Sequence, residues 1–208
     1  GSTFAAKTTT TYGRAGNMPS DLTWQPEERF PKCIYVDFIK GIALNAVGLG
    51  GPGAAEVLRR GFDSETILDS SWPISQPYMI SWGPEGATPA ARVDEFSAFV
   101  KLLQGYLSSN TALYRLIGLQ INLSCPNTKV KIAQLLEEAG ALLDIAAALG
   151  IPIMVKVNLL VPVEAIRGMA AHPACDGICL SNTIPFGELP HRIPWADWFP
   201  NGSPLAEF

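Results

Sequence analysis

From residue 76 onward, the sequence alternates short apolar runs with longer segments of helical periodicity. This alternation is typical of a chain of βα units, in which each strand is followed by a helix that returns to the same sheet. The strands are predicted at residues 76–82, 116–122, 151–157 and 176–180. Their nearly continuous apolar character indicates a parallel sheet that is covered on both faces. The predicted fold class is therefore α/β.

The spacing of apolar residues predicts a helix after each of the first three of these strands. The first begins with Thr88 and Pro89, a cap and a first-turn proline, and runs to about residue 107. The second spans residues 130–149, where Gly150 supplies a left-handed cap. The third is a short helix over residues 162–171.

Upstream of residue 76, the sequence predicts one more strand and one more helix. The strand covers residues 2–10 and the helix covers residues 53–60. Between them, residues 12–51 form an irregular excursion that is rich in proline and glycine. Such long excursions are usually functional rather than connective.

Five strands and four helices are too few for a complete eight-stranded β/α barrel, which takes about 250 residues. A doubly wound open sheet is the alternative architecture. The placement of polar residues favours the barrel, because a barrel assembles its active site at the carboxyl ends of successive strands. Polar residues at or near the ends of five different predicted strands are Lys7, Ser81, Asn122, Lys156 and Asn182. We predict a single TIM-type barrel domain over residues 1–208.

Composition excludes several classes of protein. A formal net charge of −4 gives no basic surface for a nucleic acid. No apolar run reaches the roughly 18 residues that a membrane span needs, so no membrane partner is expected. Four cysteines without a CxxC pair predict a reducing compartment, the cytoplasm. Cys175 and Cys179, with only His172 and His191 to complete a ligand set, are expected to be structural, so no metal site is predicted.

The segment QINLSCPNT, residues 120–128, contains the most informative residue, Cys125. It places a thiol among amide and hydroxyl side chains, where a predicted strand leads into a helix. A free thiol has a pKa of about 8.5, which a helix N-terminus or a nearby cation lowers, so a cysteine at this place can act as a general base. The alternative is that Cys125 is a small buried hydrophobic residue.

Several separate motifs resemble the dihydroorotate dehydrogenase family of FMN-dependent β/α barrels, in particular its class 1 members. The motifs, in chain order, are AKT at 6–8, RAGN at 14–17, LNAVGL at 44–49, NLSCPNT at 122–128, MVK at 154–156 and LSNT at 180–183. The cysteine loop is the most specific of them. Ala6, Ala15 and Met18 depart from the family's TKT and REGNP patterns.

The resemblance implies oxidation of dihydroorotate to orotate in pyrimidine biosynthesis, with FMN as the cofactor. It implies that Cys125 is the catalytic base and that Lys156 is the cation beside the flavin. The other implied cofactor-binding residues are Lys7, Thr8, Ser81 and Asn122, and the implied substrate-binding residues are Asn45, Gly48, Leu49, Asn122, Asn127, Asn182 and Thr183. A homodimer, or a dimer with additional subunits, is the assembly that the resemblance implies.

The family has an earlier first strand, and it continues with further strands and glycine-rich turns that hold the FMN phosphate. The resemblance therefore implies an incomplete barrel in this chain, with the first and last strands missing, and poor FMN binding by these 208 residues alone. Three other functions remain open. They are a dihydropyrimidine or dihydrouridine oxidoreductase on the same scaffold, a barrel lyase that uses Lys156 to form a Schiff base, and a non-catalytic barrel remnant.

Overall fold

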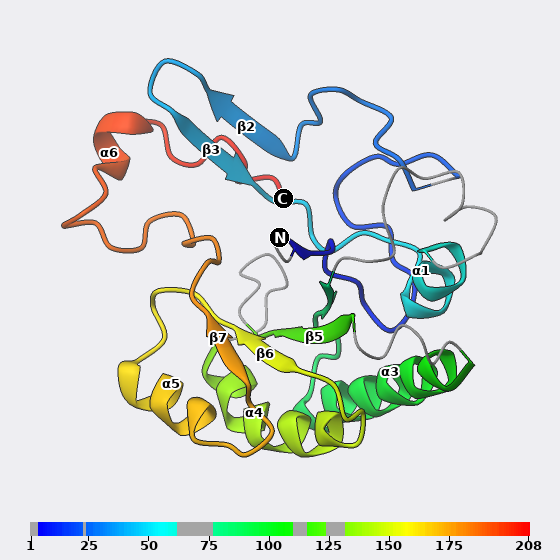
Figure 1. Cartoon of the computed structure of the whole chain (residues 1–208). Helices are drawn as coiled ribbons and strands as arrows, with labels where there is room; N and C mark the ends of the chain where they lie inside the picture. Colours follow the sequence, from blue (N-terminus) through cyan, green and yellow to red (C-terminus); the bar gives the residue numbers. More distant parts are fainter. Residues whose placement is uncertain (1–3, 23, 62–76, 110–115, 124–131) are drawn as a thin grey trace.

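The computed structural model describes residues 4–22, 24–61, 77–109, 116–123 and 132–208 (Figure 1). Its main sheet has five parallel strands in the order β1-β4-β5-β6-β7. The strands are β1 (Phe4–Ala5), β4 (Tyr78–Trp82), β5 (Ile117–Asn122), β6 (Ile153–Lys156) and β7 (Gly177–Cys179). The prediction of an α/β fold with a parallel sheet is confirmed.

Four helices lie along the sheet in the same order as the strands. They are α1 (Ala54–Gly61), α3 (Pro89–Ser109), α4 (Ile132–Ala147) and α5 (Val163–Ala170). Each packs against the next, α1 against α3, α3 against α4 and α4 against α5, and all four lie along the outside of the sheet (Figure 1). A doubly wound sheet carries helices on both faces and reverses its strand order. The described part of the chain instead keeps its helices in one layer and its strands in sequence order.

The helix ends follow the chemistry of their residues. The Thr88 hydroxyl accepts a hydrogen bond from the Ala91 amide at 3.2 Å, and Pro89 occupies the first position of α3, where it has no N–H to leave unpaired. Gly150, with φ of 63°, follows the last turn after α4 in the left-handed conformation that glycine adopts without steric cost. Both boundaries were predicted from these residues.

The hydrophobic core lies between the sheet and the helices. On β4, Ile80 and Trp82 point into it, and the indole of Trp82 lies 4.6 Å from the ring of Phe96 on α3, centroid to centroid. On the two neighbouring strands the core residues also alternate: Ile117, Leu119 and Ile121 on β5, and Ile153 and Val155 on β6. Because successive side chains of a strand point to opposite faces, the residues between them face away from the helices.

The predicted irregular excursion is partly wrong, because it contains an antiparallel hairpin, β2 (Ile34–Asp37) with β3 (Ile42–Asn45). The Asp37 carboxylate accepts hydrogen bonds from the Ile39 and Lys40 amides and so closes the turn. These two strands pair with each other rather than with the main sheet, so the βα pattern does not reveal them. Of the predicted strand at residues 2–10, residues 2 and 3 lie outside the described residues, and the described part forms only β1, followed by an isolated bridge between Thr9 and Trp82.

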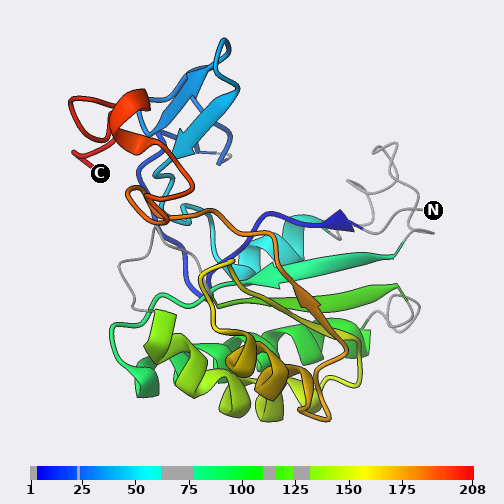
Figure 2. The same cartoon turned by 90° about the vertical axis from the view of Figure 1, so that its left-hand side faces the viewer.

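The hairpin carries the end of the chain. Tyr35 packs edge-on against Phe199 at 5.6 Å, and Phe186 packs against Trp195 of α6 (Trp195–Trp198) at 4.8 Å, both between ring centroids. Figure 2 shows the hairpin and α6 together, at the end of the molecule toward which the strands of the main sheet point. These aromatic contacts therefore hold the C-terminal segment against the hairpin, at the carboxyl ends of the strands of the main sheet.

Candidate functional site

The sheet face that lies opposite the helices is polar near the carboxyl ends of its strands. Ser81 on β4 and Gln120 and Asn122 on β5 are 1%, 5% and 4% exposed, and they alternate with apolar core residues. Buried polar side chains are nearly always hydrogen-bonded, because an unpaired polar group in the interior loses its hydration without compensation. Their partners therefore define the arrangement of this face.

A chain of hydrogen bonds joins these three side chains to two others, Thr8 and Asn182. The Asn182 amide donates to Asn122 Oδ1 at 2.9 Å, and Asn122 Nδ2 donates to Thr8 Oγ1 at 3.2 Å. The Thr8 and Ser81 hydroxyls lie 2.9 Å apart, and Ser81 donates to Gln120 Oε1 at 3.1 Å. Because the single hydroxyl proton of Ser81 goes to Gln120, Thr8 must donate to Ser81. All the donors therefore run in one direction, from Asn182 to Gln120.

This chain, which we call the amide–hydroxyl chain, holds side chains from the ends of β1, β4, β5 and β7 in fixed positions. The structure thus brings together four of the predicted site residues: Thr8, Ser81, Asn122 and Asn182. Gln120 was missed by the sequence analysis. Its signal was a single amide in an otherwise apolar strand, two residues before Asn122 and therefore on the same face.

Lys156 lies beside the amide–hydroxyl chain. It is the register partner of Asn122 on β5 and of Cys179 on β7, so the three side chains share one face of the sheet. Lys156 is half-buried, and within the described residues no hydrogen bond or ion pair holds its ammonium. A cation that is unpaired and next to fixed amides is suited to stabilise negative charge on a bound ligand.

The segment at residues 48–50 approaches the same end of the sheet. Lys7 is exposed, and its ammonium donates to the Gly50 carbonyl at 2.9 Å. A Cβ at Gly83 would lie 2.9 Å from Thr8 Cγ2 and 3.3 Å from Leu49 Cδ1, so glycine leaves the room in which Thr8 and Leu49 meet. Gly48 is buried and has φ of 75°. Leu49 is thus placed next to Thr8 of the amide–hydroxyl chain, whereas a Cβ at Gly48 would face Asn17.

The remaining predicted residues are less central. Asn45 lies exposed at the carboxyl end of β3, on the hairpin. Thr183 is exposed, and its backbone N–H donates to Asn182 Oδ1 at 3.0 Å, which orients the Asn182 amide. The predicted catalytic base, Cys125, and the predicted substrate ligand Asn127 lie outside the described residues.

The two cysteines that were weighed as metal ligands make local contacts. The Cys175 thiol donates to the Gly177 carbonyl at 3.5 Å, and Cys179 lies 3.0 Å from the Ser181 hydroxyl. Burial raises the pKa of Cys175 above its ordinary value. Among the described residues, no three His, Cys, Asp or Glu side chains gather in a way that could hold a metal ion.

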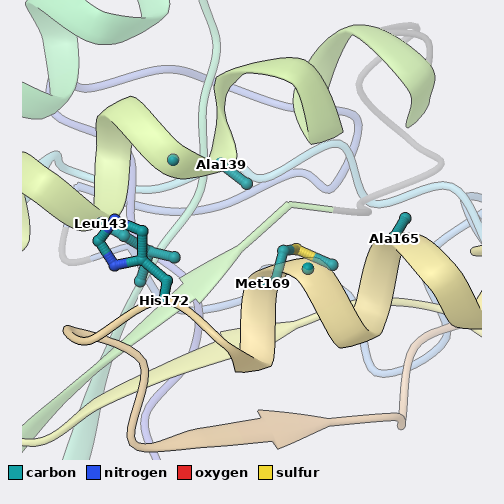
Figure 3. Close-up of a pocket in the computed structure, with 7 residues that line it drawn as sticks. Ala139, Leu143, Ala165, Met169 and His172 are labelled. Atoms are coloured by element: carbon teal, nitrogen blue, oxygen red, sulfur yellow. The ribbon is translucent and has the colours of Figure 1, made fainter.

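A separate hollow lies between α4 and α5, in the helix layer and so across the sheet from the amide–hydroxyl chain (Figure 3). It is lined by Ala139, Gly140, Leu143, Ala165, Gly168, Met169 and His172. The His172 imidazole accepts from the Ala174 amide through Nδ1 and lies 3.2 Å from Asp144 through Nε2. Small residues on both helices leave this hollow, and its wall is mainly apolar.

No helix in the described ranges combines the length and the apolar character that crossing a bilayer requires. No protein-family model matches the chain, and no curated protein matches its sequence.

Proposed function

We propose that the protein is a flavin-dependent oxidoreductase that oxidises dihydroorotate to orotate, built on a β/α barrel of the class 1 dihydroorotate dehydrogenase type. The observation that carries the proposal is the register pairing of Lys156 with Asn122, which puts beside the amide–hydroxyl chain a cation that has no ion-pair partner among the described residues. Strand order and a single helix layer are also what one wall of such a barrel has.

The donor set fits the pyrimidine edge of FMN, which alternates carbonyl and N–H groups. Asn122 keeps one N–H of Nδ2 for a ligand, the Thr8 and Ser81 oxygens each keep an acceptor lone pair, and Lys156 offers one positive charge. FMN, when bound, supplies the hydride acceptor for the reaction. The ammonium of Lys156 would stabilise negative charge on the ring of that cofactor.

The reaction removes a proton and a hydride from neighbouring carbons of the substrate. Cys125 would be the base that takes the proton from C5, and the hydride acceptor for C6 would be supplied by FMN. This role comes to Cys125 from the resemblance of the NLSCPNT segment. Asn122 and Asn182 bind the substrate ring, since amides match its N–H and C=O groups without adding charge. We assign a dimeric assembly on the same resemblance, and the cytoplasm on the cysteine usage of the chain.

The substrate is tested with the protein in its full natural length. We expect a yellow protein whose visible flavin band bleaches when dihydroorotate is added without oxygen. Bleaching by a dihydropyrimidine or by dihydrouridine, but not by dihydroorotate, would move the assignment to those substrates. A colourless protein that gains no flavin on incubation with FMN would contradict the proposal.

The base is tested by Cys125→Ser. A serine hydroxyl is far less acidic than a thiol, so we expect flavin reduction to slow by about a hundredfold or more while flavin stays bound. The matched control is Cys175→Ser, at a residue that packs against the helix-side core, and we expect this variant to keep near-normal reduction. An unchanged reduction rate in Cys125→Ser would refute the assignment of the base.

A second function is favoured by the place of Lys156 on a strand and by the lack of a counter-ion for it among the described residues, because a lysine is the nucleophile with which a barrel lyase attacks a carbonyl. A barrel lyase would form a Schiff base on Lys156. Borohydride reduction in the presence of a carbonyl substrate would then leave a stable adduct on that residue, found by peptide mass analysis. A flavin bound in the purified protein would exclude this alternative.

A further inference from the structure

Asn158 follows β6, two residues after Lys156, and it is fully buried, with 0% of its surface exposed. Val157, between them, belongs to the core on the helix side of the sheet, and its amide continues the ladder by donating to the Cys179 carbonyl at 3.0 Å. Successive side chains of an extended strand point to opposite faces. The Asn158 side chain therefore points to the face that carries Lys156 and the amide–hydroxyl chain.

The orientation of the Asn158 amide is fixed by a turn. Its Oδ1 accepts a hydrogen bond from the Leu160 backbone N–H at 2.9 Å, and only the oxygen of the amide can accept from an N–H. The nitrogen, Nδ2, is thereby held in one place. It is buried, and within the described part of the chain it has no hydrogen-bond partner.

An unpaired buried donor costs roughly 1–3 kcal/mol, so its presence calls for a reason. The turn does not supply one, because the turn uses only the oxygen, which aspartate or serine would offer as well. Among the described residues the amide nitrogen is thus the part of Asn158 that the fold leaves unused, and strand alternation places it on the polar face of the sheet.

We propose that Asn158 Nδ2 donates a hydrogen bond to a ring carbonyl of a pyrimidinedione that is bound over the polar face. This chemistry is shared by the flavin ring and by orotate, and the inference rests on the proposed function. A strand advances about 3.3 Å per residue, so Lys156 and Asn158 stand about 6–7 Å apart along the strand. They hold the bound ring at two separated points: Lys156 attracts negative charge on the ring, and Asn158 donates a directional hydrogen bond to a ring carbonyl.

The test compares variants in the full-length protein. Asn158→Asp keeps the oxygen that closes the turn and, in its ionised form, lacks the donor. Asn158→Ala removes both the turn oxygen and the donor, and Asn201→Asp adds the same charge at an exposed position. The affinities for FMN and for orotate are measured separately, FMN by flavin fluorescence and orotate by the difference spectrum of the flavin-loaded protein.

We expect the dissociation constant for one of the two probes to rise by about tenfold or more in both Asn158 variants, and the probe identifies the ring that is bound. Asn201→Asp should leave both constants unchanged. Constants within about twofold of the wild type for both probes would overturn the inference while leaving the proposed function standing. A wild-type protein that binds neither probe would overturn both.

If the variants do not fold, the wild-type protein still decides the matter. The side-chain amide signals of Asn158 in a ¹⁵N–¹H spectrum should shift when the bound probe is added, because the proton of Nδ2 enters a new hydrogen bond. Signals that stay in place while the probe binds would overturn the inference.

Discussion

Asn122 on β5 and Lys156 on β6 are register partners in adjacent parallel strands, so an amide and an ammonium stand side by side on the same face of the sheet. The amide is fixed on both sides, since Asn122 accepts from Asn182 and donates to Thr8. The ammonium has no such partner among the described residues. The pair therefore combines one rigid neutral group with one cation that is available to a ligand.

The amide–hydroxyl chain predicts a large cost for removing its central residue. Asn122→Leu takes away the acceptor of Asn182 and the donor of Thr8 and leaves buried polar atoms without those bonds. We expect the free energy of unfolding to fall by about 2–4 kcal/mol in a urea titration. Asn201→Leu, at an exposed position, should change it by less than about 0.5 kcal/mol. Equal effects of the two substitutions would contradict the buried chain.

Much of this arrangement could be predicted from the sequence, because a polar residue that ends an apolar strand is visible in the letters. Ser81, Asn122 and Asn182 were found in this way. Gln120 was not, because a single amide inside a strand looks like noise until its partner across the sheet is known. Asn158 was missed for a similar reason, since its burial depends on how the chain turns after β6.

The hairpin was missed for a different reason. Strands β2 and β3 pair with each other through the turn after Asp37 and do not join the main sheet. The alternation of strands and helices therefore carries no information about this hairpin. The aromatic contacts of Tyr35 with Phe199 join segments more than a hundred residues apart, which a single sequence does not reveal. The core was easier to predict, because its residues repeat at the spacing of strands and helices.

The close packing around Gly50 predicts that alanine at Gly50 lowers stability far more than alanine at the neighbouring Gly51. A Cβ at Gly50 would lie 2.4 Å from the Ala15 carbonyl oxygen, which is backbone and cannot move without disturbing the pairing of this segment. A Cβ at Gly51 would meet nothing within 4 Å. We expect Gly50→Ala to lower the melting temperature by several degrees, equivalent to about 1–3 kcal/mol, and Gly51→Ala to leave it nearly unchanged. A Gly50→Ala protein as stable as the wild type would show that the two segments do not approach this closely.

Arg92 on α3 and Glu138 on α4 form a buried ion pair. We therefore expect the effects of substituting the two residues on the free energy of unfolding to be strongly coupled. Arg92 Nε donates to Glu138 Oε2 at 2.8 Å, a second bond joins Nη2 to Oε1, and Nη1 donates to the Gly86 carbonyl at 3.0 Å. We expect Glu138→Ala to cost about 3–5 kcal/mol of unfolding free energy, because it leaves the guanidinium charge uncompensated. The double variant Arg92→Met with Glu138→Leu should regain most of that loss. A double variant as unstable as Glu138→Ala would contradict this account.

The raised pKa of Glu85 predicts that the free energy of unfolding depends on pH. Burial raises the pKa of Glu85 above its ordinary value; Arg14, 3.3 Å away, opposes the shift and Glu95 adds to it. Because the folded state holds this proton more tightly than the unfolded state, the contribution to stability is present below the ordinary glutamate pKa and is lost as the pH rises through the raised value. Glu85→Gln should remove this decline in unfolding titrations over that range. An identical pH profile in the variant would show that Glu85 does not contribute.

The most direct test of the proposed site is the affinity of the full-length protein for FMN, compared between Lys156→Met and Lys101→Met. Lys101 is an exposed lysine of α3, in the helix layer and across the sheet from the amide–hydroxyl chain. The proposal predicts that Lys156→Met weakens FMN binding by about tenfold or more, whereas Lys101→Met leaves it unchanged. Equal affinities in the wild-type protein and both variants would contradict the placement of a flavin beside Lys156.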